Sequence, residues 1–281
     1  FTCTNLGTNP VTVILTDQSG NNSYCFPTLT VIDNTPPTLT CPSNIAVFTD
    51  VNQCNAVVNY AVSATDNCTV SSVVKTSGLA SGSQFPVGVS TINYSATDQS
   101  GNVSTCSFTV TVTDNQAPNA LCQNVTVQLD ATGNGSTTAA AVNNGSNDAC
   151  GIASLVLSQT AFVCSEVGAN TETLTVTDNN GNVSTCTTTV TVQDLVAPVA
   201  LCQNVTVSLN AAGTGSTTAS AVNNGSSDAC GIASTVLSQT AFTCANVGAN
   251  PVVLTVTDVN GNVSTCSATV TVQDLIAPVA V

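Results

Sequence analysis

The sequence predicts an all-β protein, built as an elongated array of tandem immunoglobulin-like β-sandwich domains. Three observations predict it: an 80-residue unit repeats along the chain, apolar residues alternate with a period of two, and Gly- or Asn-rich turns separate the short apolar runs. About seven short strands in each unit, rich in β-branched residues, favour an antiparallel sandwich of the immunoglobulin type. The sequence contains no tryptophan, so the core is not that of an antibody domain.

The repeat is close to exact in the second half of the chain. Residues 119–198 align with residues 199–278 without a gap, and 62 of the 80 positions are identical. A more diverged copy precedes them, in which Cys106 stands 80 residues before Cys186. We therefore expect a window on a longer array. The predicted domains are a C-terminal half repeat, three complete repeats and the start of another: residues 1–36, 37–118, 119–198, 199–278 and 279–281.

The strands are predicted from the alternation of apolar and polar residues. Residues 106–112 place Cys, Phe and Val on one face and Ser and Thr on the other, as in a half-buried strand. Similar segments flank residues 178–182, whose sequence Asp-Asn-Asn-Gly-Asn indicates a hairpin turn. A further strand is predicted at residues 125–129. No convincing helix is found.

Charge excludes several classes of function. Fifteen acidic residues face a single lysine, Lys75, and the chain contains neither arginine nor histidine. Such a chain cannot neutralise a phosphate backbone, so we expect no nucleic acid as partner. No apolar run approaches the roughly 18 to 20 residues of a spanning helix, so no membrane insertion is expected in this segment. Acid–base catalysis usually uses His, a tuned Lys or a carboxylate in a pocket; here His is absent, Lys occurs once and the carboxylates recur at every junction, so we expect no enzyme.

The cysteines indicate a disulfide framework and an extracellular location. Each complete repeat contains four, in a chain rich in Thr, Ser, Asn and Val. Four cysteines permit three pairings, and spacing does not choose among them. The second repeat has Cys54 where the third instead has Cys164, and the other three positions correspond. The simplest account is that the moving cysteine keeps the same partner. Zinc is disfavoured because no close C-x-x-C pair occurs.

Eleven of the thirteen aspartates stand at three recurring places. The first is the hairpin turn, at Asp17, Asp98, Asp178 and Asp258. The second is the end of the last strand, at Asp33, Asp114, Asp194 and Asp274. The third lies two residues before a cysteine, at Asp66, Asp148 and Asp228.

Stacked sandwiches would bring the three kinds of aspartate together at each junction. The expected groups are Asp33 with Asp66 and Asp98, Asp114 with Asp148 and Asp178, and Asp194 with Asp228 and Asp258. Three carboxylates repel one another unless a cation lies among them, and calcium accepts six to eight oxygen ligands. Backbone carbonyls and the amides of Asn102, Asn182 and Asn262 could complete its coordination. Turn chemistry alone is the alternative, because Asp and Asn side chains bond to nearby backbone N–H groups in tight turns.

Several motifs of residues 37–118 resemble a hyalin repeat (HYR) domain. They are Thr40-Cys41-Pro42-Ser43-Asn44-Ile45, Thr65-Asp66-Asn67-Cys68, Gln84-Phe85-Pro86-Val87-Gly88, Ala96-Thr97-Asp98-Gln99-Ser100-Gly101-Asn102 and Cys106-Ser107-Phe108-Thr109-Val110-Thr111-Val112. The two later copies are similar to the HYR-like arrays of large surface proteins of Bacteroidetes-type bacteria. The resemblance implies an immunoglobulin-like sandwich used in extracellular adhesion or as a stalk, without catalysis.

The resemblance also implies a disulfide pairing. It suggests that Cys41 and Cys106 join the first and last strands, which gives Cys122 with Cys186 and Cys202 with Cys266 in the later copies. The remaining cysteines then close short loops, as Cys54–Cys68, Cys150–Cys164 and Cys230–Cys244. A rival pairing joins Cys164 to Cys186 and Cys3 to Cys25.

Together these features predict a segment of the stalk or fibre of a secreted, repetitive cell-surface adhesin, stabilised by disulfides and stiffened by calcium at the domain junctions. Its expected partners are neighbouring repeats of the same or an identical chain, and surface glycans or proteins. One alternative is a self-assembling extracellular filament, in which strand addition from another chain completes residues 1–36. The other is an adhesin module that binds glycans directly.

Overall fold

The computed structural model describes residues 1–278, and these form an all-β protein. Contacts divide the chain into two compact units. The first contains residues 1–117 together with the loops 148–151 and 178–182, and the second contains the other described residues. No helix among the described residues is long and apolar enough to cross a membrane.

The first 36 residues form two hairpins after a short 3-10 turn. β1 pairs with β4 and β2 pairs with β3, all antiparallel. The apolar side chains of Ile14 and Leu15 are exposed on β2, and none of the core clusters found among the described residues includes this segment. The elements are η1 (Cys3–Asn5), β1 (Gly7–Pro10), β2 (Val13–Thr16), β3 (Asn22–Cys25) and β4 (Thr28–Val31).

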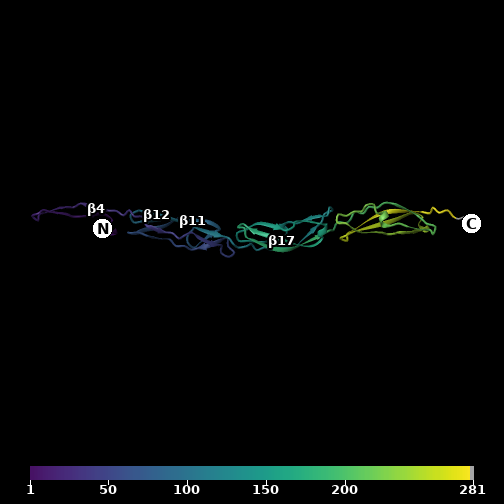
Figure 1. Ribbon diagram of the computed structural model, residues 1–281, viewed down its shortest axis with the longest axis horizontal. Helices are drawn as coiled ribbons and strands as arrows, with labels where there is room; N and C mark the ends of the chain where they lie inside the picture. Colours follow the sequence, from purple (N-terminus) through teal and green to yellow (C-terminus); the bar gives the residue numbers. More distant parts are fainter. Residues whose placement is uncertain (279–281) are drawn as a thin grey trace. The chain divides into compact units, whose positions relative to one another are not determined.

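The second repeat is a two-layer sandwich. One layer is a sheet in the order β6-β12-β11-β9, in which β6 runs parallel to β12, and the pairs β7–β10 and β5–β8 lie outside it. Figure 1 labels β11 and β12, which pair along most of their length. Phe85, Ile92 and Val110 are fully buried in the core between the layers. The strands are β5 (Thr38–Thr40), β6 (Ile45–Phe48), β7 (Asn55–Val58), β8 (Ser63–Thr65), β9 (Val70–Ser77), β10 (Ser83–Pro86), β11 (Gly88–Asp98) and β12 (Val103–Thr113).

The third repeat keeps the same sheet order, β13-β18-β17-β15, with the pair β14–β16 outside it. Its first strand again runs parallel to its last, because Val125 lies opposite Val190. Leu174, Val176 and Val190 are fully buried. The elements are β13 (Val125–Gln128), β14 (Asn134–Ser136), α1 (Ala139–Val142), β15 (Ile152–Leu157), β16 (Ala161–Val163), η2 (Cys164–Glu166), β17 (Gly168–Asp178) and β18 (Val183–Gln193).

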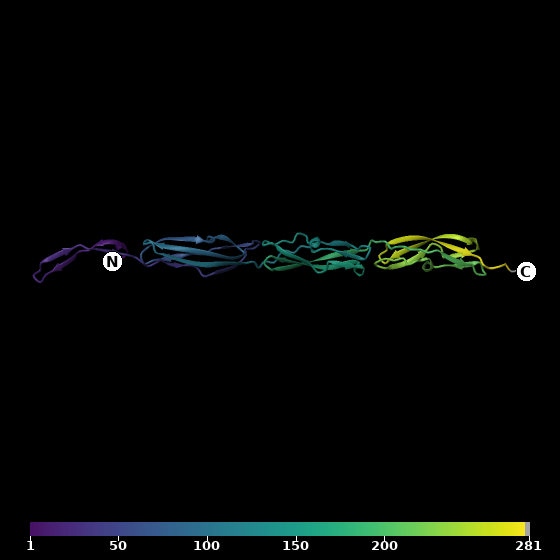
Figure 2. The same ribbon diagram turned by 90° about the horizontal axis from the view of Figure 1, so that it is seen from above.

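The fourth repeat follows the third element by element, as their near-identical sequences require. Its sheet order is β19-β24-β23-β21, with β20 paired to β22. Figure 2 shows this repeat in green and yellow. The elements are β19 (Val205–Ser208), β20 (Thr214–Ser216), α2 (Ala219–Val222), β21 (Ile232–Leu237), β22 (Ala241–Thr243), η3 (Cys244–Asn246), β23 (Gly248–Asp258) and β24 (Val263–Gln273).

The predicted hairpins are confirmed, and their strands are longer than predicted. The strand expected at residues 106–112 is part of the 11-residue β12, and its buried apolar residues Phe108, Val110 and Val112 alternate with more exposed Ser and Thr residues. The turn before it brings Asp98 N–H to the carbonyl of Asn102 at 3.1 Å. Gly101 within that turn has a φ of 91°, a value that side chains larger than hydrogen disfavour. The period of two therefore located these elements correctly.

The prediction that no helix occurs was wrong at two places. α1 and α2 are single turns of four residues, each preceded by a threonine N-cap. The hydroxyl of Thr138 accepts the N–H of Ala141 at 3.2 Å, which satisfies one of the free donors of the first turn. A four-residue helix is too short to show a 3.6-residue apolar period, so the alternation gave no sign of it.

Candidate metal centres and disulfide bonds at the repeat seams

The aspartates at the strand ends are buried except for the last. Asp33, Asp114 and Asp194 are 8%, 5% and 6% exposed, whereas the equivalent Asp274 is exposed. In the three buried residues Oδ1 accepts the backbone N–H two residues onward, at 3.0 to 3.1 Å. Their Oδ2 atoms are buried without a hydrogen-bond partner. A buried carboxylate oxygen without a donor is unusual, because such atoms are almost always paired in folded proteins.

A loop of the following repeat brings a second carboxylate to each buried aspartate. In these Asp-x-Cys loops Oδ1 of the aspartate accepts the N–H of the cysteine, at 2.8 Å for Asp66, 2.7 Å for Asp148 and 2.8 Å for Asp228. Asp66 Oδ2 is also buried without a partner. We use "seam" for each place where a strand-end aspartate lies beside the Asp-x-Cys loop of the next repeat. The three seams are Asp33 with Asp66, Asp114 with Asp148, and Asp194 with Asp228.

The hairpin aspartates are held by turn chemistry. Asp98 accepts the backbone N–H of Asn102 on Oδ1 and its side-chain amide on Oδ2, both at 2.7 Å. Burial raises the pKa of Asp98, but these bonds and two further backbone N–H groups outweigh burial, so its pKa lies below the ordinary value. The same causes lower the pKa of Asp178. Turn chemistry, the alternative to calcium in the sequence, therefore accounts for the contacts of the hairpin aspartates.

The asparagine of each hairpin joins it to the strand end of the preceding repeat. Asn102 Nδ2 donates to the backbone oxygen of Asp33 at 3.0 Å as well as to Asp98. Asn182 and Asn262 donate in the same way to the backbone oxygens of Asp114 and Asp194, at 3.3 and 3.1 Å. Each amide nitrogen is thus a donor that bridges two aspartates. The predicted role of these amides as calcium ligands would instead use the oxygen Oδ1, which none of these bonds involves, so it stays a prediction.

The predicted triads form completely at the first seam only. One carboxylate oxygen from each of Asp33, Asp66 and Asp98 lies within 4.8 Å of the other two. At the other seams the groups of this size are Asp114, Asp148 and Cys150, and Asp194, Asp228 and Cys230. Asp178 and Asp258 lie outside these groups. The two cysteine sulfurs are in disulfide bonds, so they are not thiolate ligands.

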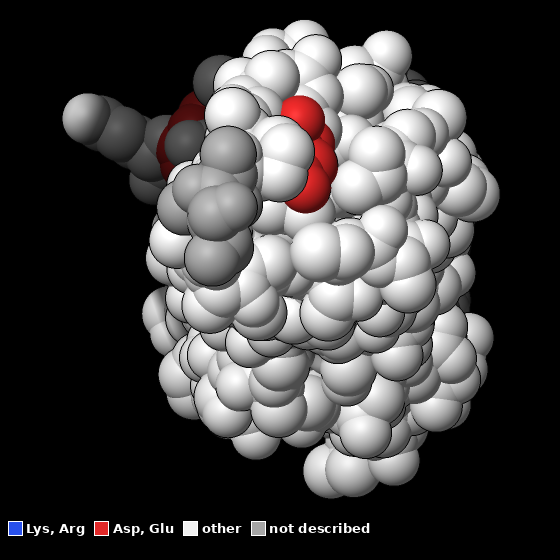
Figure 3. All heavy atoms as spheres, turned by 90° about the vertical axis from the view of Figure 1, so that its right-hand side faces the viewer, with Lys and Arg blue, Asp and Glu red and all other residues white. Residues whose placement is uncertain are grey.

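No basic side chain compensates these buried charges. Lys75 is the only basic residue of the sequence, and its ammonium donates to the carbonyl of Gly78. On the face drawn in Figure 3 the acidic atoms form small patches among uncharged residues, and no basic atoms are visible. A cation with oxygen ligands therefore fits the seams better than an ion pair does.

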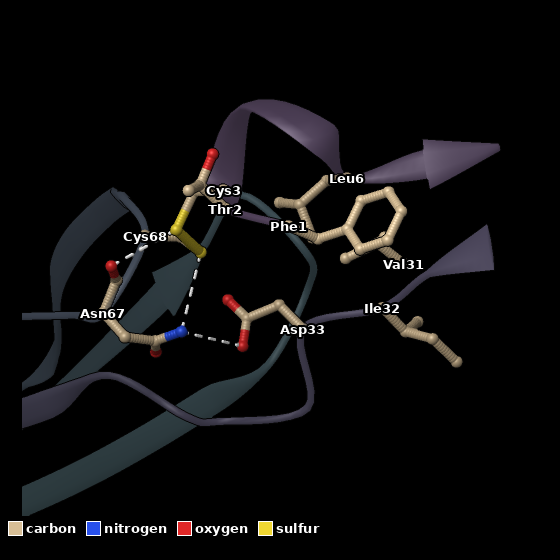
Figure 4. A pocket seen from close by; sticks show the side chains of 9 residues that line it. All are labelled: Phe1, Thr2, Cys3, Leu6, Val31, Ile32, Asp33, Asn67 and Cys68. Carbon is tan, nitrogen blue, oxygen red and sulfur yellow. Dashed lines mark hydrogen bonds between the residues drawn. A yellow bond between two sulfur atoms is a disulfide. The ribbon is translucent and has the colours of Figure 1, made fainter. Parts of the chain in front are cut away.

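Sequence reasoning missed two polar neighbours of the buried aspartates. The hydroxyl of Thr49 donates to Asp114 Oδ1 at 3.2 Å. The amide of Asn67 donates to Asp33 Oδ1 at 3.2 Å, beside the Cys3–Cys68 bond (Figure 4). Neither contact recurs among the described residues of the other seams, so the comparison of repeats gave no signal for them.

Three disulfide bonds lie within repeats, and they are the three that the resemblance implied. Each joins a cysteine just before the first strand of the four-stranded sheet to a cysteine in the last strand of that sheet. The three bonds are Cys41–Cys106, Cys122–Cys186 and Cys202–Cys266. The rival pairing of Cys164 with Cys186 is therefore wrong.

The expected short-loop pairs were also wrong, because the remaining bonds join successive repeats. Instead of Cys54–Cys68, Cys150–Cys164 and Cys230–Cys244, the structure contains Cys3–Cys68, Cys54–Cys150 and Cys164–Cys230. In each bond the second cysteine belongs to an Asp-x-Cys loop. The loop that supplies the second carboxylate of a seam is thus bonded covalently to the preceding repeat. Cys25 and Cys244 are free and exposed, so the rival bond Cys3–Cys25 is also not formed.

The displacement of one cysteine between repeats has a simple structural basis. Asn55 pairs with Pro86 in the second repeat, and Asn134 pairs with Val163 in the third. Cys54 therefore corresponds in place to Gly133, and Cys164 stands on the neighbouring strand end. A Cβ atom on Gly133 would lie 2.6 Å from the sulfur of Cys164. The sulfur thus reaches a similar position from either of two adjacent strands. Cys54 and Cys164 therefore both bond to the Asp-x-Cys loop of the next repeat.

Comparison with known proteins assigns the second repeat to a family. A family model described as HYR domain matches residues 32–112. The chain contains a HYR domain. The match begins five residues before the predicted start of this repeat at residue 37, and it ends six residues before the predicted end at residue 118. The limits of the other HYR-like repeats, and a bacterial source, stay predictions.

Two curated proteins are similar to this HYR-containing chain. Hyalin of Strongylocentrotus purpuratus is 39% identical over 211 residues, which cover 71% of this chain and 18% of hyalin. The serine-rich adhesin for platelets of Staphylococcus aureus (strain USA300) is 37% identical over 125 residues, which cover 41% of this chain and 5% of the adhesin. The chain thus spans less than a fifth of the length of either relative.

Solved cadherin structures show a weaker likeness. Mouse cadherin-23 EC22-24 gives a TM-score of 0.34 at 13% identity and covers 86% of this chain and 100% of its own. Drosophila N-cadherin EC1-4 gives 0.33 at 13% identity and covers 95% of this chain and 83% of its own.

Asp130, an aspartate away from the seams, provides a pH prediction. The hydroxyl of Thr132 and the backbone N–H groups of Asn134 and Thr132 lower the pKa of Asp130. Since the folded pKa lies below the unfolded one, this carboxylate stabilises the fold above about pH 3.9, and the contribution is lost as pH falls through the folded pKa. We expect carboxyl NMR titration to place this pKa below about 3.9 and Thr132→Ala to raise it. The fourth repeat has alanine at this position, Ala212, so the substitution suits the fold. An unchanged pKa in the variant would contradict the assigned cause.

Proposed function

We propose that this chain is a segment of the stalk or fibre of a secreted, repetitive cell-surface adhesin. The observation that carries the proposal is the recurrence of one seam: a disulfide between successive repeats, beside buried carboxylates, occurs at Cys3–Cys68, Cys54–Cys150 and Cys164–Cys230. Joining each repeat to the next is the task of a structural array. A ligand-binding module would not need the same junction at every repeat.

The relatives support an extracellular role in adhesion. One is named hyalin and the other a serine-rich adhesin for platelets. The six disulfide bonds among the described residues suit an oxidising environment outside the cytosol. Catalysis forms no part of the proposal.

Calcium at the seams is the second part of the proposal. Burying a carboxylate away from any donor or cation is costly, and the seams hold Oδ2 atoms of Asp33, Asp66, Asp114 and Asp194 in this state. Calcium prefers carboxylate and carbonyl oxygens, and it would offset both the repulsion and the missing hydrogen bonds. Asp33, Asp66 and Asp98 would hold it at the first seam, Asp114 with Asp148 at the second, and Asp194 with Asp228 at the third. The ion would then bridge two repeats.

Two of the tyrosines serve packing, which argues against sugar stacking on them. The ring of Tyr60 lies edge-on to Phe108 with 4.9 Å between centroids, and edge-on to Tyr94 at 6.3 Å. Its hydroxyl donates to the carbonyl of Leu79 at 2.6 Å. Direct glycan binding therefore gains no support from these aromatic residues.

Small-angle X-ray scattering tests the structural proposal. In the presence of calcium we expect the particle to have a single, well-defined maximum dimension. After the calcium has been chelated and the disulfides reduced, we expect a broader distribution of particle shapes. A compact particle in calcium, with the repeats folded back on one another, would contradict the stalk. Growth of the scattering mass with concentration, into ordered fibres, would instead favour the filament.

A further inference from the structure

The six disulfide bonds overlap along the sequence without a gap. In order, they enclose residues 3–68, 41–106, 54–150, 122–186, 164–230 and 202–266. Each bond begins before the preceding one ends. Every peptide bond between Cys3 and Cys266 is therefore enclosed by at least one disulfide.

We infer that the protein is a covalent network in which no single backbone cut between Cys3 and Cys266 separates the chain into two pieces. This property goes beyond the proposed function, because it depends on the connectivity of the cysteines and needs neither calcium nor a stalk.

The network contains two covalent routes between successive repeats. One follows the linkers 106–122 and 186–202 and crosses each repeat through its internal disulfide. The other follows residues 54–68 and 150–164, passes between repeats through the seam disulfides and ends at Cys230. The two routes share no residue. Load or damage on one route leaves the other continuous.

The linkers show why the seam disulfides matter. Residues 186–202 lie outside both Cys122–Cys186 and Cys202–Cys266, so only Cys164–Cys230 encloses them. Leu195 in this linker is 59% exposed, and exposed linkers are where proteases cut first. In an array with internal disulfides only, a cut here would release everything beyond it.

The nearly complete absence of basic residues allows a single defined cut. Trypsin cleaves after Lys and Arg, and Lys75 is the only such residue. The variant Lys75→Gln/Leu195→Lys moves the one cleavable bond into the linker. The free thiols of Cys25 and Cys244 are alkylated first, because a free thiol could attack a disulfide and exchange it. Digestion is carried out on the folded chain, and again in urea without reductant, so that cutting does not depend on the fold.

We expect the digested variant to run as one species of the intact mass, 28.0 kDa for the parent chain, until reductant is added. Reduction should then release fragments 1–195 and 196–281. Adding Cys164→Ala/Cys230→Ala should release both fragments completely without reductant. The matched control, Cys54→Ala/Cys150→Ala, should keep them joined, because that bond encloses a different linker. Release of the fragments from the cut variant with all its cysteines, in the absence of reductant, would overturn the inference.

Discussion

Calcium at neutral pH is expected to raise the melting temperature of this chain, and chelation should reverse the rise. Four seam aspartates hold a buried carboxylate oxygen without a hydrogen-bond partner, so the proposed ion would bind the folded chain and lose its site on unfolding. At a calcium concentration 100-fold above Kd, each site would stabilise by about 2.7 kcal/mol. One kcal/mol shifts the midpoint of a small domain by about 4 to 8 °C, so the expected rise is about 10 to 20 °C. Scanning calorimetry in calcium and in chelator measures it.

Substitutions at one seam sharpen this test. Asp114→Asn should remove the calcium response of the second seam. In chelator the same substitution should be neutral or stabilising, because it removes a buried carboxylate that has no cationic partner and whose Oδ2 has no hydrogen-bond donor. Asp274→Asn is the matched control, since Asp274 occupies the equivalent place, accepts the N–H of Ile276 at 3.1 Å and is exposed. A midpoint of the parent chain that does not change with calcium would contradict the metal centres.

Removing the disulfide within the third repeat should destabilise that repeat by about 4 kcal/mol, because a loop of about 64 residues regains its freedom in the unfolded chain. The double variant Cys122→Ala/Cys186→Ala tests this without leaving a free thiol. A loss of this size is a large part of the roughly 5 to 15 kcal/mol that stabilises a typical domain. It should lower the midpoint of the third repeat by about 15 to 30 °C.

Hydrogen exchange measured by mass spectrometry can locate that loss. The amides of Leu174, Val176 and Val190 lie in fully buried strand positions and should lose protection in the variant. Ile92 and Val110 of the second repeat serve as internal controls, because their own disulfide is intact. Equal loss of protection in both repeats would show that the bond does not act locally.

The fold could be predicted because local pattern and packing agree. Buried and exposed residues alternate along β12 and β18, so a period of two marked these strands and the turn at residues 178–182 marked their hairpin. The 80-residue repeat carried the result from one copy to the next. The short helices α1 and α2 were not predicted, because four residues are too few to show a helical period of apolar residues.

The disulfides between repeats could not be predicted from spacing. The pairs Cys54–Cys68 and Cys150–Cys164 were predicted only because they remained once the resemblance had paired the other cysteines. What decides the pairing is that Cys150 lies on the loop 148–151, which belongs to the first compact unit and not with the rest of its repeat. Sequence spacing contains no such information.

The acidic residues of the seams were found by their recurrence, but their individual roles were not. Asp98, Asp178 and Asp258 share one motif with Asn102, Asn182 and Asn262, and their carboxylates are satisfied by that motif. Asp33, Asp114 and Asp194 have the same spacing to a Pro-containing linker and yet hold an unpaired oxygen. This difference depends on which atoms meet across a seam, and only coordinates show it.

Disulfide mapping is the most direct test of the claim that successive repeats are bonded at their seams. The folded chain, with free thiols alkylated, is digested with pepsin at low pH, where disulfide exchange is slow. Mass spectrometry of the unreduced peptides should then find Cys3 with Cys68, Cys54 with Cys150, and Cys164 with Cys230. Peptides that join Cys54 to Cys68 and Cys150 to Cys164 would contradict it.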